Sequence, residues 1–213
     1  MPNYDYENPN VRQSKDLVLA PNEFCFIQNK TSGAIKTYTR PKTSTISQQE
    51  ALVVFDTRSK QFIEVSNFDQ AKQLFVSAPE NWYVILKNPA ENNTHPEAAK
   101  GVASPALQVG RKVNVRGPIS FSLFPGQMAK VVRGHALRSN QYLLARVYEA
   151  ESASQSAGEM LDTEGNKIET KNTYVNGQIL VIKGTEVSFY IPPTGIEVIP
   201  VDNSPIKGYV QRG

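Results

Sequence analysis

Three strand-like segments of the sequence begin in the same way. They read "NEFCFIQN" from residue 22, "NWYVILKN" from residue 81 and "NQYLLARV" from residue 140. Each starts 59 residues after the one before, and each has an aromatic third residue, namely Phe24, Tyr83 or Tyr142. Similar segments in the same order and at equal spacing indicate an internal repeat, so the chain is constrained to three tandem copies of one small unit.

Each opening segment is followed, after a connector of varying length, by a second similar module. The modules are "GAIKTYTRPKTSTISQQEALVVF" at 33–55, "GRKVNVRGPISFSLFPGQMAKVV" at 110–132 and "GQILVIKGTEVSFYIPPTGIEVI" at 177–199. In each, a strand leads to Arg-Pro, Gly-Pro or Gly-Thr, then to a short apolar segment, a polar turn and a closing apolar strand. Glycine and proline allow a strand to reverse within few residues. Units of four or five short strands cannot bury a core alone, so neighbouring units must stack.

Alternation of apolar residues predicts which face of each unit points inward. We expect Val113 and Val115, Ile179 and Val181, and Ile35 to lie on that face. Helical periodicity is scarce. Short helices are predicted at 67–76, with Asn67 as N-cap, and more weakly at 149–161. The predicted fold class is therefore mainly β, with three tandem small antiparallel β repeat domains and one or two short helices.

The spacing also predicts the boundaries of the domains. We expect a flexible N-terminal arm, three β repeats of which the first carries a short helix and the third an acidic insertion, and a final segment that is either a C-terminal strand or the start of a fourth repeat. Their residues are 1–17 for the arm, 18–78, 79–135 and 136–204 for the repeats, and 205–213 for the final segment.

Charge is segregated along the chain although the formal net charge is only +3. Residues 98–148 contain eight Lys or Arg residues and no acid, whereas residues 149–170 contain six acids and one lysine. The candidate inter-subunit or polyanion contacts are Arg111, Lys112, Arg116, Lys130, Arg133, Arg138 and Arg146. The candidate acidic counterparts are Glu149, Glu151, Glu159, Asp162, Glu164 and Glu169.

Three interpretations of this segregation stay open. The charges can form a solvated face beside core aromatic residues, they can form an electrostatic seam between the basic region of one subunit and the acidic region of the next, or the basic region can bind nucleic acid or another polyanion. The small net charge and the nearby acids argue against a dedicated DNA-binding protein.

Residues for catalysis or metal binding are sparse. The only histidines, His95 and His135, are expected in a loop and a turn, and neither has a second ligand at metal-binding spacing. Cys25 lies in a strand-like run and is expected in the core. No nucleophile elbow, phosphate-binding loop or dinucleotide-binding fingerprint is present. We therefore predict no enzyme activity, no cofactor and no metal.

The repeat resembles the tandem repeats of the major vault protein family. The residues that carry the resemblance are Gly117-Pro118, Gly184-Thr185, Pro192-Pro193 and the closing Ile196-Glu197-Val198-Ile199. It covers residues 20–200, and the chain departs from the family in its long connectors and in having three units. The sequence is also similar to vault-repeat proteins among the virion components of large tailed bacteriophages. The resemblance implies small antiparallel β domains strung end to end, with identical chains laid side by side in a shell or ring, and it supplies no catalytic residues.

The preferred function is therefore a structural protein that self-associates laterally into a ring, sheath or shell, as a virion component or a cytoplasmic particle. Its expected partners are copies of itself and other structural proteins of the same particle; nucleic acid is a less favoured partner, and no membrane is expected. No apolar run marks a signal peptide or a membrane helix. The alternative is a monomeric module that binds a nucleic acid or an acidic protein through the basic 98–148 region.

Overall fold

The computed structural model describes residues 16–39, 42–97, 101–169, 173–201, 204–205 and 208–209. These residues belong to two compact units. The first unit comprises the chain up to Leu74 together with Pro96–Ser104, and the second comprises Phe75–His95 and the chain from Pro105 onward. The predicted arm falls outside the described residues except for its last two positions, where the first strand begins.

The first unit contains one copy of the repeat and some additional strands. Its elements are β1 (Asp16–Leu19), β2 (Glu23–Asn29), β3 (Ile35–Thr39), β4 (Lys42–Thr45), β5 (Glu50–Asp56), β6 (Gln61–Glu64), α1 (Phe68–Ala71), β7 (Gln73–Leu74) and β10 (Val102–Ala103).

The second unit contains the other two copies. Its elements are β8 (Val76–Ala78), β9 (Trp82–Lys87), β11 (Lys112–Arg116), β12 (Ile119–Phe121), β13 (Met128–Arg133), β14 (His135–Ala136), β15 (Gln141–Val147), α2 (Ala150–Gln155), β16 (Glu159–Leu161), β17 (Ile179–Lys183), β18 (Phe189–Ile191), β19 (Ile196–Val198), β20 (Pro200–Val201), β21 (Ser204–Pro205) and β22 (Gly208–Tyr209).

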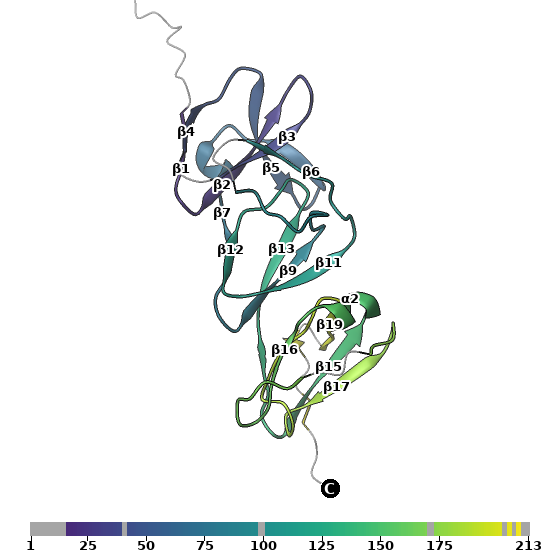
Figure 1. Ribbon diagram of the computed structural model, residues 1–213. Coiled ribbons are helices and arrows are strands. Elements are labelled where there is room, and N and C mark those ends of the chain that lie inside the picture. Colours follow the sequence, from purple (N-terminus) through teal and green to yellow (C-terminus); the bar gives the residue numbers. More distant parts are fainter. Residues whose placement is uncertain are drawn as a thin grey trace, which may run out of the picture. The chain divides into compact units, whose positions relative to one another are not determined.

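The same antiparallel ladder occurs three times. The predicted opening segment is always the central strand, with β2 between β3 and β5, β9 between β11 and β13, and β15 between β17 and β19 (Figure 1). The register also repeats, because Phe24, Tyr83 and Tyr142 lie opposite Thr39, Arg116 and Lys183. The predicted fold of three small antiparallel β repeats is confirmed.

A second, smaller sheet completes each repeat. It consists of β1 and β4 in the first copy, of β8 and β12 in the second, and of β14 and β18 in the third, where β16 also pairs with β18. Apolar residues of each copy cluster around its strands. Cys25, Val84 and Leu143 occupy the same position in the three central strands, and all are fully buried. The expectation that Cys25 belongs to the core is confirmed.

The predicted inward face is correct for β11 and wrong for β3 and β17. In β3, Ile35 lies on the same face as Thr37, whereas Tyr38 on the other face packs against the core. Val113 and Val115 pack against the core of the second repeat. In β17, however, Leu180 and Ile182 pack inward, whereas Ile179 and Val181 are about half exposed, at 50% and 53%. The five apolar-rich residues "ILVIK" do not reveal which alternate set faces inward; the register with β15 decides it.

Both predicted helices are present but shorter than expected. Asn67 caps α1 by accepting a hydrogen bond from the Asp69 N–H at 2.8 Å. The helix ends at Ala71 because the chain becomes extended at Lys72 and then pairs with β2 as β7. In the second segment α2 ends at Gln155, and residues 159–161 form β16. Within the described part of the chain, no helix is both long and apolar enough to cross a membrane.

Two segments outside the repeated three-stranded ladders add strands to them. The long connector of the second repeat supplies β10, which pairs with β3 of the first unit. The predicted final segment supplies β22, which pairs with Gln141 and Tyr142 of β15. Residues 206–207 and 210–213 of that segment lie outside the described part of the structure.

The glycines of the two predicted turns approach neighbouring backbone closely. The Gly117 N–H donates to the Trp82 carbonyl at 2.9 Å, and the Gly184 N–H donates to the equivalent Gln141 carbonyl at 2.8 Å. A Cβ atom at Gly117 would overlap the Pro79 carbonyl oxygen, and one at Gly184 would overlap the Arg138 carbonyl oxygen. The repeated glycine is therefore required by packing of the backbone rather than by a positive φ.

We expect Gly184→Ala to destabilise the protein by about 3 kcal/mol, because a methyl group forced against backbone displaces the turn. The matched control is Gly33→Ala. Gly33 has a φ of 73° and open space around it, so alanine there costs only about 1 kcal/mol of backbone strain. Chemical denaturation of both variants measures the difference, and equal losses would contradict the packing argument.

Candidate functional site

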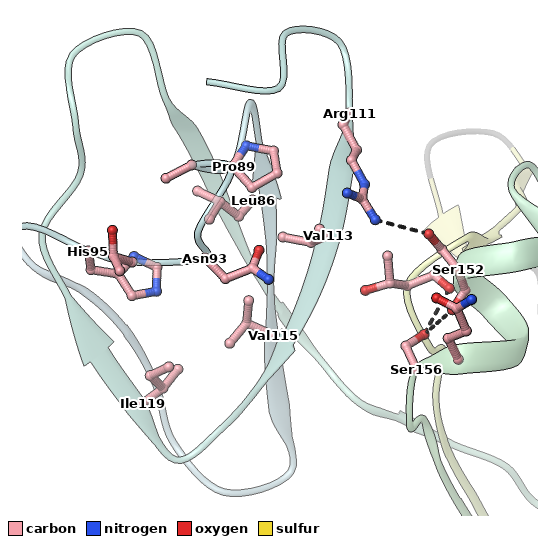
Figure 2. A pocket seen from close by; sticks show the side chains of 14 residues that line it. Leu86, Pro89, Asn93, His95, Arg111, Val113, Val115, Ile119, Ser152 and Ser156 are labelled. Carbon is pink, nitrogen blue, oxygen red and sulfur yellow. Dashed lines mark hydrogen bonds between the residues drawn. The ribbon is translucent and has the colours of Figure 1, made fainter. Parts of the chain in front are cut away.

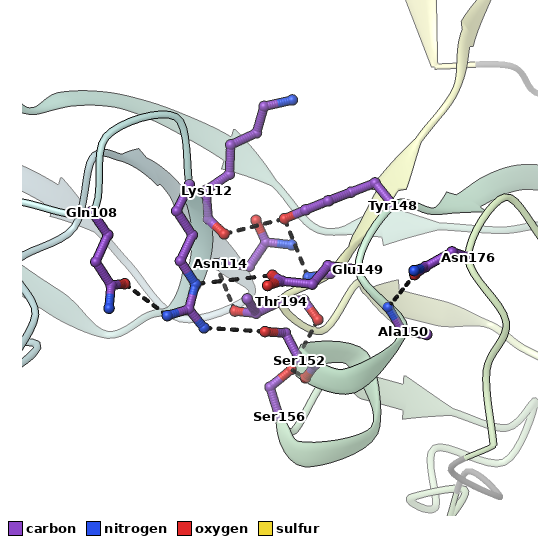
Figure 3. Close-up of polar contacts among 12 residues, drawn as sticks. Gln108, Lys112, Asn114, Tyr148, Glu149, Ala150, Ser152, Ser156, Asn176 and Thr194 are labelled. Carbon is purple, nitrogen blue, oxygen red and sulfur yellow. Dashed lines mark hydrogen bonds and ion pairs between the residues drawn. The ribbon is translucent and has the colours of Figure 1, made fainter.

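Asn114 on strand β11 lies at the centre of the contact between the second repeat and the third. Asn114 donates from its side-chain Nδ2 to the carbonyls of Pro192, Pro193 and Ile196, at 3.2, 3.0 and 3.3 Å. Its backbone N–H donates to the Thr194 Oγ1 at 2.9 Å (Figure 3). The turn 192–196 is buried throughout. An edge strand of one repeat thus uses its free N–H and one amide side chain to hold the turn before the closing strand of the next repeat.

Tyr148 binds both sides of the same junction. Its hydroxyl donates to the Lys112 carbonyl at 3.2 Å and accepts from the Gly195 N–H at 3.2 Å (Figure 3). The Lys112 ammonium lies 5.5 Å from the centre of the Tyr148 ring, within cation–π distance. Burial raises the pKa of the Tyr148 hydroxyl, so it stays protonated and keeps its role as a donor.

Ion pairs also join the second and third repeats around Asn114. Arg116 Nη2 lies 3.1 Å from Glu159 Oε2, and Arg111 Nε lies 3.9 Å from Glu149 Oε2. The Arg111 guanidinium also donates to Gln108 Oε1 at 2.7 Å and to Ser152 Oγ at 3.1 Å. Basic residues in β11 and immediately before it therefore contact acids of the third repeat within a single chain.

Glu197 is the acid with the most cation contacts at this junction. Lys112 Nζ lies 3.3 Å from its Oε2, and Arg146 donates to its Oε1 from Nε at 3.1 Å and also from Nη2. Partial burial acts to raise the pKa of this carboxyl, but the hydrogen bonds from Arg146 and Lys112 outweigh it. The pKa of Glu197 therefore lies below its usual value.

Two grooves lie beside the junction, and each has a volume of about 460 Å³. One lies between the core-facing valines of β11 and the serines of α2, with Arg111 reaching across to Ser152 (Figure 2). The other is lined by Lys87, Lys112 and Lys130 together with apolar and aromatic residues. The first is amphipathic and the second is basic, so either could accept an extended polar segment.

The structure brings together only part of the predicted charged set. Arg111, Lys112, Arg116 and Arg146 pair with Glu149, Glu159 or Glu197. Asp162 accepts hydrogen bonds from the N–H groups of Glu164 and Asn166 within a turn, which lowers its pKa. Among the described ion pairs none involves Lys130, Arg133, Arg138, Glu151, Glu164 or Glu169, and all six are exposed.

Sequence reasoning missed Asn114, Tyr148, Thr194 and Glu197. A signal was present for Asn114 alone, because it stands between two valines where the third repeat has Val181. A polar residue at one copy of a repeated apolar position indicates a partner that only this copy has. The other three depend on a contact between repeats, which no pattern within one repeat can show.

Several aromatic and imidazole side chains pack within the repeats. Tyr83 and Tyr190 are buried, burial raises the pKa of both hydroxyls, and the Tyr83 hydroxyl lies 3.2 Å from His135 Nε2. His135 is buried in β14, so its predicted place in a turn is wrong. His95 stacks on Phe121 with ring centres 3.8 Å apart. Within the described residues, no group of three or more His, Cys, Asp or Glu side chains is arranged to hold a metal ion.

The chain matches no protein-family model and no curated protein.

We expect Asn114→Ala to lower the free energy of unfolding by about 2 kcal/mol, because it leaves three carbonyls of a buried turn without their shared donor. Asn140→Ala is the matched control at an exposed position of the same unit and is expected to change stability by less than about 0.5 kcal/mol. Urea denaturation compares the two, and a neutral Asn114→Ala variant would show that the amide does not hold the junction.

Glu197→Gln is expected to change the pH dependence of stability. A lowered pKa means that the carboxylate stabilises the fold fully above its unfolded pKa of roughly 4.3, and that this contribution is lost as the pH falls through the lower folded pKa. The variant should therefore be less stable at pH 7, by no more than about 1 kcal/mol because the group is solvent-screened, and should approach the wild type near pH 2. Thermal melts from pH 2 to 7 test this, with the exposed Glu169→Gln as control; a constant offset would disprove it.

Proposed function

We propose that the chain is a non-enzymatic structural protein of vault-type β repeats, whose copies associate laterally into a ring, sheath or shell such as that of a virion. The observation that carries the proposal is the junction at Asn114, where one repeat accepts the turn of the next through backbone, amide and ion-pair contacts. A repeat whose edge strand binds another repeat in the same chain has the surface chemistry needed to bind a repeat of another chain.

The exposed charges support the same proposal. Arg133 and Arg138 in the basic region, and Glu151 and Glu169 in the acidic region, are exposed. They are available as the complementary sides of a seam between subunits, where they would steer orientation and register more than they would add affinity.

Light scattering of the purified full chain, at low and high salt, tests this function. We expect a large, discrete oligomer whose mass falls as salt screens the seam. A monomer of 23.6 kDa at both salt concentrations would overturn the proposal.

A second candidate is a monomeric module that binds nucleic acid or another polyanion. The observation in its favour is the basic groove, where Lys87, Lys112 and Lys130 lie on one sheet face and Glu197 is the one acid among the described lining residues. Here the double variant Lys130→Glu/Arg133→Glu separates the functions, because Lys130 lines the groove and Arg133 belongs to the exposed charges of the seam. Loss of self-association favours the seam, whereas loss of retention on a nucleic-acid column with unchanged mass favours the module.

The matched control for that double variant is Arg58→Glu/Lys167→Glu, which makes the same charge change at two exposed positions outside the basic region. If both double variants behave alike, the effect comes from net charge and neither interpretation of the basic region stands.

A further inference from the structure

The outer face of the three-stranded ladder differs in its residues and its exposure among the three copies of the repeat. In the first copy this face carries Phe24, Phe26 and Thr37, all buried. In the second copy its edge strand carries Asn114 and Lys112, which bind the third repeat. In the third copy, the registers place Val181 where Asn114 stands and Ile179 where Lys112 stands. Both are about half exposed, so this edge strand presents an apolar pair to solvent where the second copy presents polar groups to a partner.

The turn that binds such a face also differs in burial between copies of the repeat. In the third repeat the turn 192–196 is buried against Asn114 and its neighbours. The pairing of Gln28 with Ala51 and of Arg146 with Glu197 makes Ser47, Gln48 and Gln49 of the first repeat the equivalents of Pro193, Thr194 and Gly195. Those three residues are exposed. An open face and an open turn thus belong to the two end repeats.

We propose that the outer face of β17, formed by Ile179 and Val181, binds the turn Ser47–Gln49 of a second copy of this chain, head to tail. This proposal rests on the self-association in the proposed function, and it specifies one contact between subunits, which extends the array of repeats from end to end and is separate from the lateral contacts. The precedent is the contact between Asn114 and Thr194 within one chain. In the proposed contact, Val181 of one copy takes the place of Asn114, and Gln48 of the next copy takes the place of Thr194. Removal of the apolar surface of Ile179 and Val181 from water takes the place of the three amide hydrogen bonds. The carbonyls of the turn, to which neither side chain can donate, stay hydrated.

Such a contact joins two different surfaces, so it leaves one open face and one open turn after every addition. Association is therefore heterologous and continues until a ring closes or a filament grows. A second copy is favoured over an unrelated partner because it carries, in Ser47–Gln49, the repeat equivalent of the turn that binds the corresponding face of the second repeat.

Substitution of Val181 by Glu tests the face. A charge placed on a surface that must be desolvated should raise the concentration at half-assembly by roughly tenfold or more. Val109→Glu makes the same change at a turn position that is 85% exposed and outside the face, and it should assemble like the wild type. Sedimentation velocity over a concentration series measures both, after circular dichroism has shown that both variants are folded.

Cysteine cross-linking tests the partner. Gln48→Cys and Val181→Cys are made in separate chains, while the native Cys25 is fully buried and does not compete. Under oxidation, a mixture of the two single variants should form a mixed dimer, and the double variant should form a ladder of oligomers. A dimer between two Val181→Cys chains alone would indicate a back-to-back contact and overturn the proposal.

The outcomes separate this proposal from the proposed function. If the wild type assembles and Val181→Glu assembles equally well, the function stands and this contact is wrong. If the wild type stays monomeric at every concentration, both fail. If Val181→Glu lowers the melting temperature of a monomer without altering its mass, a segment of the same chain covers the face, and the proposal is likewise overturned.

Discussion

Each repeat can cover only one face of its three-stranded ladder from its own residues. The smaller sheet and its apolar side chains cover the inner face, as Ala78 and Phe121 do against Val84 and Leu86 in the second repeat. The outer face then needs something else, because three short strands leave too little buried area for independent stability. Most of the remaining architecture follows from this need, including the buried aromatic face of the first repeat and the junction at Asn114.

At the junction, polar groups cover the outer face of the second repeat, and this fixes the geometry of the contact. Three carbonyls converge on the Asn114 amide, and Tyr148 bridges two backbone groups, so the docked position is defined by directional bonds. The surrounding ion pairs are partly exposed and add little net stability. The charge segregation seen in the sequence thus acts here mainly on orientation, with the amide and hydroxyl bonds holding the contact.

Much of the fold could be predicted from the sequence, since it depends on patterns within one repeat. The 59-residue spacing locates the three central strands, and the position of Cys25 in an apolar run locates it in the core. Features that depend on contacts between distant residues could not be predicted. The helix after Asn67 ends early because the following residues pair with β2, and the inward face of β17 is decided by its partner strand. Likewise, Glu197 gains its importance only where Lys112 and Arg146 meet it.

The contrast between Asn114 and Val181 distinguishes the junction within the chain from the contact proposed between copies of the chain. An asparagine specifies one partner geometry, because a misplaced turn would leave its amide and three carbonyls unpaired. A valine at the equivalent position has no polar group of its own to leave unpaired, and its contacts tolerate small changes in how a partner sits. An internal junction formed once during folding benefits from strict geometry. In the proposed assembly, a surface that joins subunits would benefit from tolerance. The change from the asparagine side chain in the second repeat to the valine side chain in the third has that physical character.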